Sequence, residues 1–365
     1  MSNPQIVSGQ KNGVFTAADL ARKFGVSRAA VSYALNGRPG ISQELREEIL
    51  ASARKHGVPI KHPNLGTDRR LLGLILADIG NPFYSELAVS VSDAARRLGF
   101  EVILAHTDDE PRAIQSSVMS MIEHGVSGLI FTVVNANDCS ISSAIQRAGI
   151  PCVQVSRRSE NFGGAFVGIN DFAAGYEIMK HLLGHGYRDV CIAAGPRTSS
   201  SSVDRARGMA KAAADQGIKI PNSRLIFTKL SVGGGRTVAK YLLNGGKVPQ
   251  AVACGTDSIA IGLIDAMHKE GIQCPEDIAV VGYDGLLFSR MEMVELTTIV
   301  QPREEMAIAA VDLLIKAQSD PTVTSQSVFC NYWLSIGRTC GCSPLSVTQD
   351  SDNIHGLNRK HEYTI

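Results

Sequence analysis

The chain has 365 residues, of which 44% are hydrophobic and 19% are charged, and its formal net charge is +1. This composition excludes a disordered chain and a bundle of membrane helices, and the length is sufficient for two or more domains. The sequence lacks an apolar run long enough to span a bilayer, and residues 1–13 lack the apolar core of a signal peptide. A cytoplasmic protein is therefore expected. Averaged over the whole chain, a charge near zero argues against a nucleic-acid partner.

The cysteines are spread along the chain, and most lie in apolar runs, which predicts reduced, buried thiols and no disulfide framework. The eight are Cys139, Cys152, Cys191, Cys254, Cys274, Cys330, Cys340 and Cys342. The last two form a C-x-C pair. A metal site would need two more ligands close by, and the sequence around the pair offers none. Packing is thus the preferred interpretation, with neither a metal nor a cofactor expected.

Residues 1–13 are predicted to be a disordered arm, and residues 14–57 then show three short helical patterns. The predicted helices span Ala17–Phe24, Arg28–Leu35 and Gln43–His56. Thr16, Ser27 and Ser42 stand at their N-cap positions. Gly25 takes the turn position, where a positive φ is easiest for glycine. Two helices joined by so short a turn are typical of the helix-turn-helix, whose second helix enters the major groove of DNA.

The distribution of charge along the chain removes the objection raised by its average. Residues 1–70 hold eleven basic and five acidic side chains, a net charge of +6, whereas the remaining 25 basic and 30 acidic side chains give −5. A basic head on an acidic body is typical of a DNA-binding domain attached to a separate module.

Residues 58–70 contain two prolines, a glycine and, counting His62, four basic residues, and are predicted to be a linker or hinge. Apolar strand patterns then alternate with helical ones. The strands are expected at 71–76, 101–105, 128–133, 152–155, 190–194, 251–254 and 278–282, and the helices at 83–98, 111–123, 173–183, 203–216, 235–243, 258–269 and 304–316. Such alternation indicates parallel sheets covered on both faces.

There are too many of these units for one compact sheet, so two α/β lobes with a cleft between them are expected over residues 71–342. The N-lobe is predicted at about 71–169 and 301–328, and the C-lobe at about 170–300 and 329–342. Residues 343–365 are polar and without periodicity, and are predicted to be a disordered tail.

The segment from Phe15 to Gly37 closely resembles the head of the lac-repressor (LacI/GalR) family of bacterial transcriptional regulators. Further matches are Asp78–Tyr84, His181–Tyr187, Pro275–Asp284 and Leu296–Pro302, so that the resemblance covers about residues 15–342. It implies a multidomain protein with an all-α helix-turn-helix head and a two-lobed α/β body similar to periplasmic sugar-binding proteins. The implied function is transcription regulation, as a repressor that binds near-palindromic double-stranded operator DNA as a homodimer and responds to a small effector.

The resemblance places the base-reading side chains at the start of the second helix, at Arg28, Ala29 and Tyr33. Arg28 is suited to a bidentate contact with guanine, and Ala29 to a thymine methyl group. Tyr33 stands where many members carry Arg, and helix packing is its alternative role. The implied phosphate contacts, which fix the register on DNA, are Thr16, Ser27, Ser32 and Asn36.

Members of the family usually carry a short hinge helix in the linker that inserts a leucine into the minor groove. Here the linker is about three residues shorter, and Pro63 and Gly66 oppose a helix. Leu65 is the one candidate for the inserted side chain, with Arg69 and Arg70 as phosphate contacts. The linker is therefore expected to bind DNA without a regular hinge helix, or to bend it less.

In α/β lobes, ligands bind at the carboxyl ends of strands and between lobes. That position alone selects Asp78, Arg157, Asp257 and Asp284, and the resemblance adds Phe83, Tyr84, Asn170, Asp171, Arg205 and Gln301. Arg205 is expected to bind a hydroxyl pair or a carboxylate, Asp284 to accept hydrogen bonds, and an aromatic ring to offer a flat face. Helix capping is the alternative role for Asp171 and Asp257.

The pocket departs from sugar-responsive members, many of which carry Asp, Asn and Asp where this chain has Ser156, Thr256 and Gly285. With fewer acceptors for hydroxyls, a common hexose is less expected as the effector. The alternatives are a nucleoside, a less hydroxylated sugar and a phosphorylated sugar. Two other classes compete. A solute-binding protein is opposed by the basic head and the missing signal peptide. A cytoplasmic small-molecule enzyme is opposed by the lack of GxSxG, Walker A and HExxH motifs, so the protein is predicted not to be an enzyme.

Overall fold

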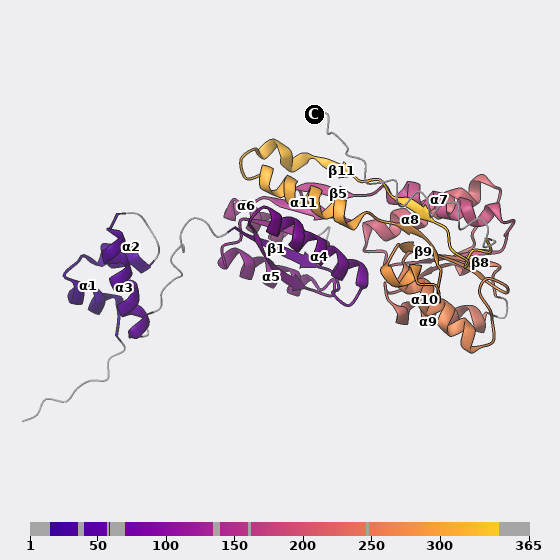
Figure 1. Ribbon diagram of the computed structural model, residues 1–365, viewed down its shortest axis with the longest axis horizontal. Coiled ribbons are helices and arrows are strands. Elements are labelled where there is room, and N and C mark those ends of the chain that lie inside the picture. The colour runs from indigo at the N-terminus through magenta and orange to yellow at the C-terminus, as the bar shows by residue number, and fades with distance from the viewer. Residues whose placement is uncertain are drawn as a thin grey trace, which may run out of the picture. The chain divides into compact units, whose positions relative to one another are not determined.

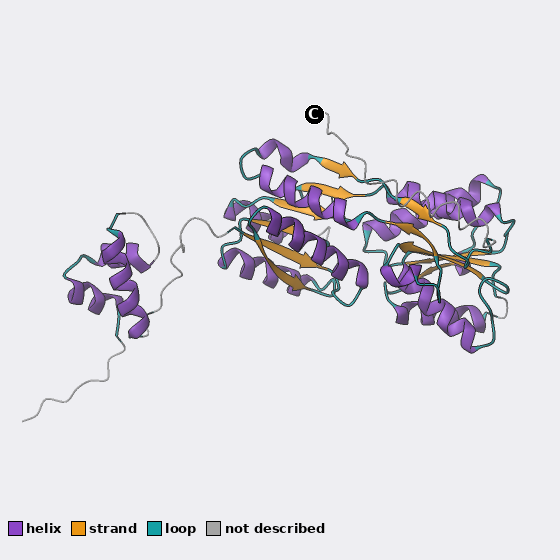
Figure 2. Ribbon diagram, in the orientation of Figure 1, coloured by secondary structure: helices purple, strands orange, loops and turns teal. Residues whose placement is uncertain are grey.

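The computed structural model describes residues 15–35, 40–56, 58, 70–133, 139–159, 162–245 and 248–342. The predicted N-terminal arm, nearly all of the linker and the predicted tail lie outside these ranges. The chain separates into two compact units, Met1–Arg69 and Arg70–Ile365, which we call the head and the body. They are shown in Figures 1 and 2 and are considered separately below.

The head consists of helices α1 (Ala17–Phe24), α2 (Arg28–Leu35) and α3 (Gln43–Lys55). The Asp19 carboxylate accepts hydrogen bonds from the backbone N–H and the hydroxyl of Thr16, at 2.8 and 2.6 Å, and so fixes the start of α1. Gly25 ends α1 at φ 64°, as the turn requires. The three helices bury one small core, whose members include Leu20, Val31, Ala34, Ile49 and Ala53.

The N-lobe of the body is built on a parallel six-stranded sheet in the order β11-β5-β4-β3-β1-β2. Its strands are β1 (Leu71–Leu76), β2 (Glu101–His106), β3 (Gly128–Phe131), β4 (Cys152–Val155), β5 (Ala165–Gly168) and β11 (Ser327–Phe329). Its helices are α4 (Pro82–Arg97), α5 (Pro111–Glu123), α6 (Cys139–Ala148) and α11 (Arg303–Lys316). Helices α4 and α11 pack together on the sheet, and α5 packs on β1 and β2.

The C-lobe has a second six-stranded sheet, in the order β12-β10-β9-β8-β6-β7. Its strands are β6 (Val190–Ala194), β7 (Leu225–Phe227), β8 (Ala251–Cys254), β9 (Ala279–Asp284), β10 (Thr297–Val300) and β12 (Trp333–Ser335). Its helices are α7 (Asp171–Gly184), α8 (Ser200–Asp215), α9 (Val232–Asn244) and α10 (Asp257–Lys269). The expectation of wholly parallel sheets is wrong at one edge, because β12 pairs antiparallel with β10.

Alternation along the C-lobe strands explains why helices cover both faces of this sheet (Figure 2). Val190 and Ile192 of β6 belong to the larger core on the side of α7 and α8, whereas Cys191 and Ala193 belong to a second core with α9 and α10. Consecutive buried residues therefore serve opposite faces, and the strand is apolar throughout.

The chain crosses between the lobes three times: between β5 and α7, between β10 and α11, and between β11 and β12. Each lobe is thus assembled from segments far apart in the sequence (Figure 1). The crossings place Asn170, Asp171 and Gln301 at the junction of the lobes. The sequence reading missed β5, β7, β10, β11, β12 and α6, all of which have at most four residues except α6. Among the described helices, none is both long and apolar enough to cross a membrane.

Candidate functional sites

The helix pair of the head presents one exposed face of α2. Arg28, Ala29, Ser32 and Tyr33 are exposed, whereas Val31, Ala34 and Leu35 are buried against α1 and α3. Ala29, Ser32 and Tyr33 follow Arg28 by one, four and five residues, so the four side chains share one side of the helix. The structure therefore brings the predicted base-reading side chains together on a surface accessible to a groove.

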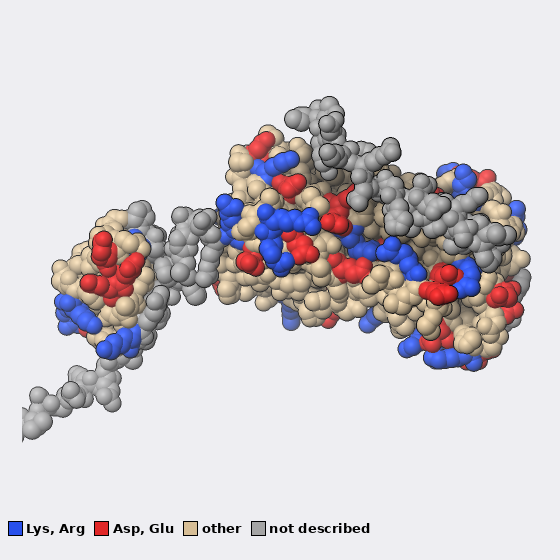
Figure 3. All heavy atoms as spheres, viewed as in Figure 1, with Lys and Arg blue, Asp and Glu red and all other residues tan. Residues whose placement is uncertain are grey.

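Other side chains of the head start the helices or support α2. The Ser27 hydroxyl accepts from the N–H of Ala30 at 3.1 Å, and the exposed Thr16 stands at the start of α1. Tyr33 is 37% exposed, and its ring lies against Gly40, where an added Cβ would approach it to 3.2 Å. Tyr33 thus has both an exposed edge and a packing contact. In the view of Figure 3, the acidic side chains of the head gather in one patch apart from the basic ones.

Of the remaining predicted DNA contacts, only Arg70 lies within the described residues. Asn36, Leu65 and Arg69 lie outside the described residues. Arg70 belongs to the body, where its guanidinium donates to the carbonyl of Leu98 at 2.8 Å and lies 5.6 Å from the ring centroid of Phe100. Figure 3 shows acidic and basic atoms interleaved over the visible face of the body, in contrast to the head.

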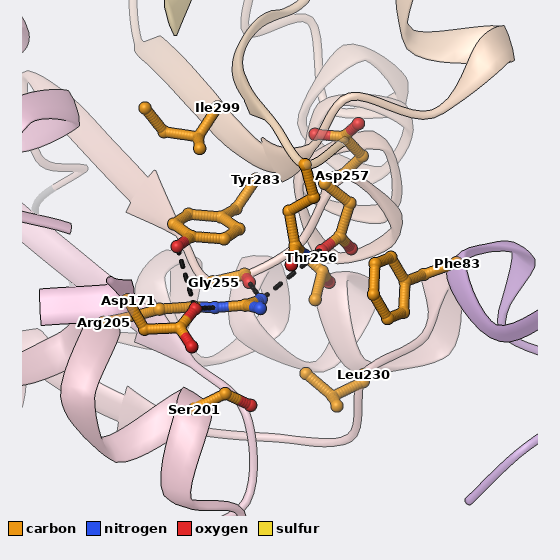
Figure 4. A network of polar contacts seen from close by, with 12 residues as sticks. Phe83, Asp171, Ser201, Arg205, Leu230, Gly255, Thr256, Asp257, Tyr283 and Ile299 are labelled. Atoms are coloured by element: carbon orange, nitrogen blue, oxygen red, sulfur yellow. Dashed lines mark hydrogen bonds and ion pairs between the residues drawn. The ribbon is translucent and has the colours of Figure 1, made fainter. Parts of the chain in front are cut away.

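A buried polar network occupies the C-lobe side of the lobe junction, with Arg205 at its centre (Figure 4). Nε of Arg205 donates to Asp171 at 2.8 Å, and Nη1 donates to the carbonyl of Gly255 at 2.8 Å and lies 3.4 Å from Asp284. The Tyr283 ring lies under the guanidinium at 3.8 Å, and its hydroxyl donates to Asp171 at 2.8 Å. The guanidinium of Arg205 thereby holds Asp171, Gly255, Tyr283 and Asp284 in one arrangement.

Asp284 and Gln301 carry the observation that most directly indicates a ligand. Oδ1 of Asp284 accepts from Nε2 of Gln301 at 2.7 Å. Oδ2 of Asp284 and Oε1 of Gln301 are buried and lack a hydrogen-bond partner in the described structure. Asp284 also has φ 120°, an unfavourable backbone conformation for a residue with a side chain. Unsatisfied buried acceptors beside strained backbone are typical of a binding site for hydrogen-bond donors.

Burial controls the electrostatics of this network. It raises the pKa of Asp171 and of Asp284, and the nearby Arg205 cation opposes both shifts. Burial lowers the pKa of Arg205 itself, but the negative charge of Asp171 and its neighbours more than compensates, so the net shift is upward. Arg205 therefore remains charged, and its two carboxylate partners hold it in place.

The N-lobe side of the junction carries Phe83, Tyr84 and Arg157. The two rings are buried and meet edge to face with centroids 5.3 Å apart. Figure 4 shows Phe83 pointing from α4 toward Leu230 and the Arg205 network. Nη1 of Arg157 binds both oxygens of Asp109, at 2.7 and 2.9 Å, while its buried Nε lacks a partner among the described groups. Phe83 thus points toward the network, but neither it nor Tyr84 or Arg157 lines the pocket described below.

Two predicted carboxylates have local partners instead. Asp257 is fully buried, and its oxygens accept from the Thr298 hydroxyl at 2.5 Å and the N–H of Leu286 at 2.8 Å. Thr256, rather than Asp257, caps α10. Oδ1 of Asp78 accepts from the N–H of Gly80 at 2.7 Å, which stabilises the loop after β1. The capping role considered for Asp171 is also wrong, because Asn170 caps α7.

A pocket of about 390 Å³ opens next to this network, at the junction of the two lobes. Its walls combine hydroxyl, amide and charged groups with three phenylalanine rings. The lining residues are Ser156, Arg158, Phe166, Ile169, Asn170, Asp171, Phe172, Ser200, Ser201, Asp204, Arg207 and Phe329. Asp171 belongs to both the pocket and the Arg205 network, so a ligand in the pocket would touch the network directly.

Three residues of the N-lobe make polar contacts to the C-lobe, and the sequence pattern predicted none of these contacts. Nδ2 of Asn81 donates to the carbonyl of Leu230 at 3.2 Å, and the N–H of Arg158 donates to the Ser200 hydroxyl at 3.0 Å. Arg303, at the start of α11, donates to the carbonyls of Asp284 and Gly285 at 2.5 and 3.0 Å and pairs with Glu86 at 2.8 Å. Their partners are backbone atoms or residues far along the chain, which a sequence pattern does not reveal.

A helix-turn-helix head with an exposed recognition face, attached to a two-lobed body with a polar pocket, defines a ligand-responsive DNA-binding regulator. Comparison with known families agrees. Residues 16–58 match the description "Bacterial regulatory proteins, lacI family", and residues 69–332 match "Periplasmic binding proteins and sugar binding domain of LacI family". The chain belongs to the LacI family of bacterial regulatory proteins, which confirms the predicted family, fold class and non-enzymatic regulatory function.

Among curated relatives, the transcriptional regulator DegA of Bacillus subtilis strain 168 is 30% identical over 296 residues, covering 80% of this chain and 88% of DegA. The transcriptional repressor PurR of Glaesserella parasuis serovar 5 is 26% identical over 304 residues, covering 82% of this chain and 89% of PurR. Among solved structures, the complex of the transcriptional regulator CelR with cellobiose superposes with a TM-score of 0.68 at 22% identity, covering 88% of this chain and 99% of CelR. At this level of identity, the superposition shows that the two proteins share a fold.

Proposed function

We propose that this protein is a cytoplasmic transcriptional repressor that binds a near-palindromic operator as a homodimer and is released or retained by a small polar effector. One observation carries the effector part of the proposal: buried acceptor oxygens of Asp284 and Gln301 lack partners among the described groups in a network at the lobe junction, and this network shares Asp171 with a pocket of about 390 Å³. A cavity of this size is within the range of small-molecule sites.

The DNA contacts follow from the exposed face of α2. Arg28 reads guanine, Ala29 contacts a thymine methyl group, and Tyr33 contacts a third base from its exposed edge. Thr16, Ser27, Ser32 and Asn36 contact phosphates. In the linker, Leu65 enters the minor groove and Arg69 contacts a phosphate. Arg70 is left out of this set, because its guanidinium is held on the body by Leu98.

The pocket lining favours a hydroxylated effector. The hydroxyls of Ser156, Ser200 and Ser201 and the polar groups of Asn170 and Asp171 offer donors and acceptors for ring hydroxyls. Three phenylalanine rings provide apolar surface for the faces of a sugar or nucleoside. Arg158 and Arg207 also line the pocket, and their positive charges could bind the phosphate of a phosphorylated sugar. CelR, whose complex contains cellobiose, has the same fold.

The effector acts through the contacts that join the lobes. Arg303 of the N-lobe donates hydrogen bonds to the carbonyls of Asp284 and Gly285 in the loop after β9. A ligand that binds the Asp284 side chain changes the position of this loop and so favours one relative arrangement of the lobes over another. Because DNA affinity and effector affinity are linked through these two states, each ligand changes the affinity of the other by the same factor.

Operator binding is tested by fluorescence anisotropy on DNA selected from random sequence, measured over a range of salt. Arg28→Ala should relax sequence preference at one position by roughly 1–3 kcal/mol. Arg69→Ala should weaken all DNA alike and reduce the salt slope. The opposite pattern would overturn the assignment, and an unchanged affinity and bend for Leu65→Ala would remove the role of the linker leucine.

The effector is tested by thermal-shift screening of sugars, sugar phosphates and nucleosides, with and without operator DNA. A ligand that stabilises the wild type should change operator affinity and lose its effect in Ser201→Ala, which alters the pocket wall. Asp265→Asn, on the exposed side of α10, is the matched control. Consumption of any compound in a turnover assay would restore the enzyme alternative.

A further inference from the structure

Four metal-binding side chains converge in the C-lobe, away from the residues assigned to DNA or effector. His181 and His185 stand four residues apart at the C-terminal end of α7, so they lie on one face of the helix. Cys340 and Cys342 come from the last described segment of the chain. All four ligand atoms lie within 4.8 Å of one another. The sequence argument that the cysteine pair lacks two further ligands is thus wrong, because the histidines reach it through the fold.

Four of the six distances between these atoms have the size expected for a coordination tetrahedron. Nε2 of His181 and Nε2 of His185 are 3.4 Å apart. The sulfur of Cys340 is 3.3 Å from His181, and that of Cys342 is 3.7 Å from His181 and 3.4 Å from His185. Zinc bonds of about 2.05 Å to nitrogen and 2.3 Å to sulfur require separations of about 3.3 Å between nitrogens and about 3.6 Å between nitrogen and sulfur.

The segment that carries the cysteines is fixed by the surrounding fold. The carbonyl of Thr339 accepts from Val280 of β9 at 2.8 Å, and its hydroxyl accepts from Thr297 of β10 at 3.0 Å. The Tyr187 hydroxyl donates to the carbonyl of Cys340 at 3.2 Å. Between the two cysteines, Gly341 has φ 91°, and a Cβ there would lie 2.7 Å from that hydroxyl. This position requires glycine both for its backbone conformation and for space.

The surroundings of the sulfur also suit a bound ion. The Thr297 hydroxyl lies 3.0 Å from Sγ of Cys340, where it can support a thiolate from outside the ligand set. Cys340 is fully buried, Cys342 is half-buried and His185 is exposed, so the cluster is closed on one side and reachable from solvent on the other. An ion can therefore enter without unfolding of the lobe.

We propose that His181, His185, Cys340 and Cys342 form a structural Zn²⁺ site that joins the end of α7 to the segment after β12. Two imidazoles and two thiolates form a Cys₂His₂ set, which zinc prefers in tetrahedral geometry. All four positions are taken by protein, as in structural rather than catalytic zinc sites. The site stabilises the C-lobe and is independent of the proposed operator and effector.

The test uses the full-length, untagged protein, purified in a non-thiol reductant and analysed for zinc by mass spectrometry. We expect one zinc per chain. After removal of zinc, Co²⁺ should bind with the visible absorption of a tetrahedral centre and the charge-transfer band of a thiolate ligand, and Zn²⁺ should displace it.

His185→Ala and Cys342→Ser are the informative variants, because neither side chain is fully buried and both proteins should fold. Each should bind zinc at least about tenfold more weakly, a loss at least as large as that caused by removing an outer-sphere partner. His268→Ala and Cys330→Ser, elsewhere in the body, and the double variant His355→Ala/His361→Ala, beyond the described residues, are controls that should retain one equivalent.

Three results would overturn the proposal. The first is folded wild-type protein that takes up neither Zn²⁺ nor Co²⁺. The second is equal zinc in the wild type and in both ligand variants. The third is metal-free protein in which two thiols cannot be titrated until a reductant is added, which would identify a disulfide pair in place of a zinc site. Operator and effector binding are measured separately, so that failure of the proposed function leaves this result interpretable.

Discussion

Replacing Arg205 by methionine should destabilise the body strongly, and by an amount that depends on pH. The guanidinium is buried and binds Asp171, Asp284 and the carbonyl of Gly255. Methionine retains much of the apolar volume but leaves two buried carboxylates without a cation. Breaking a buried ion pair in this way costs roughly 3–5 kcal/mol. At about 2–4 °C per kcal/mol for a domain of this size, the melting temperature should fall by roughly 6–20 °C.

The sign of the pH dependence follows from the carboxyl groups. Burial already raises the pKa of Asp171 and Asp284, and Arg205 opposes the shift, so its loss raises both pKa values further. When the pKa of a carboxyl group is higher in the folded than in the unfolded state, the folded protein loses stability as pH rises from the unfolded-state pKa to the folded-state pKa. The deficit of Arg205→Met should therefore be small at acidic pH and increase toward neutral pH.

The assay is thermal unfolding followed by tryptophan fluorescence, because the single tryptophan, Trp333, lies in β12 and reports on the body. Arg207→Met is the matched control: this arginine is on the same helix but is 68% exposed and pairs with Asp204. It should leave the melting temperature unchanged. Replacing Asp171 and Asp284 by asparagine in the Arg205→Met background should recover part of the loss. A wild-type melting temperature for Arg205→Met, or a deficit that shrinks toward neutral pH, would refute the reasoning.

Three further changes follow from the same geometry. Asp284→Asn removes a buried carboxylate with a raised pKa and an unpartnered oxygen, so it should raise the melting temperature at neutral pH, with the gain vanishing at acidic pH, while weakening effector binding. Gly25→Ala should cost the head about 1 kcal/mol from its positive φ alone, since an added Cβ meets no atom within 4 Å, and Gly25→Asn should cost less in circular-dichroism melts. Arg303→Met should increase hydrogen exchange in the loop after β9, because two of its carbonyls lose their donor; unchanged exchange there would contradict the role of this arginine in joining the lobes.

The pattern of the sequence was sufficient where local chemistry decides the structure. In the head, N-capping side chains, a glycine at the turn and the apolar spacing each act within a few residues, and the first two helices have their predicted bounds. In the body, long apolar strands alternating with helical periods predicted two covered sheets. The strands that were missed have three or four residues, and β11 and β12 lie at sheet edges, where a short segment is held by its partner rather than by its own pattern.

The site depended more on tertiary structure. Position after a strand selected both Asp257 and Asp284, but only the packing of β10 shows that Asp257 is bound by Thr298 while Asp284 retains a free oxygen. The lobe contacts of Asn81 and Arg303 involve backbone carbonyls, which every residue carries and no pattern distinguishes.

The sequence by itself determined the class of fold, the recognition helix and the sorting of charge into a basic head and an acidic body, because these depend on residue type and short-range spacing. Only the tertiary structure could decide which distant groups meet. Cys340 and Cys342 appeared to lack partners when neighbours along the chain were considered. The fold brings them to His181 and His185, 155 or more positions earlier, because α7 and the segment after β12 pack on the same lobe.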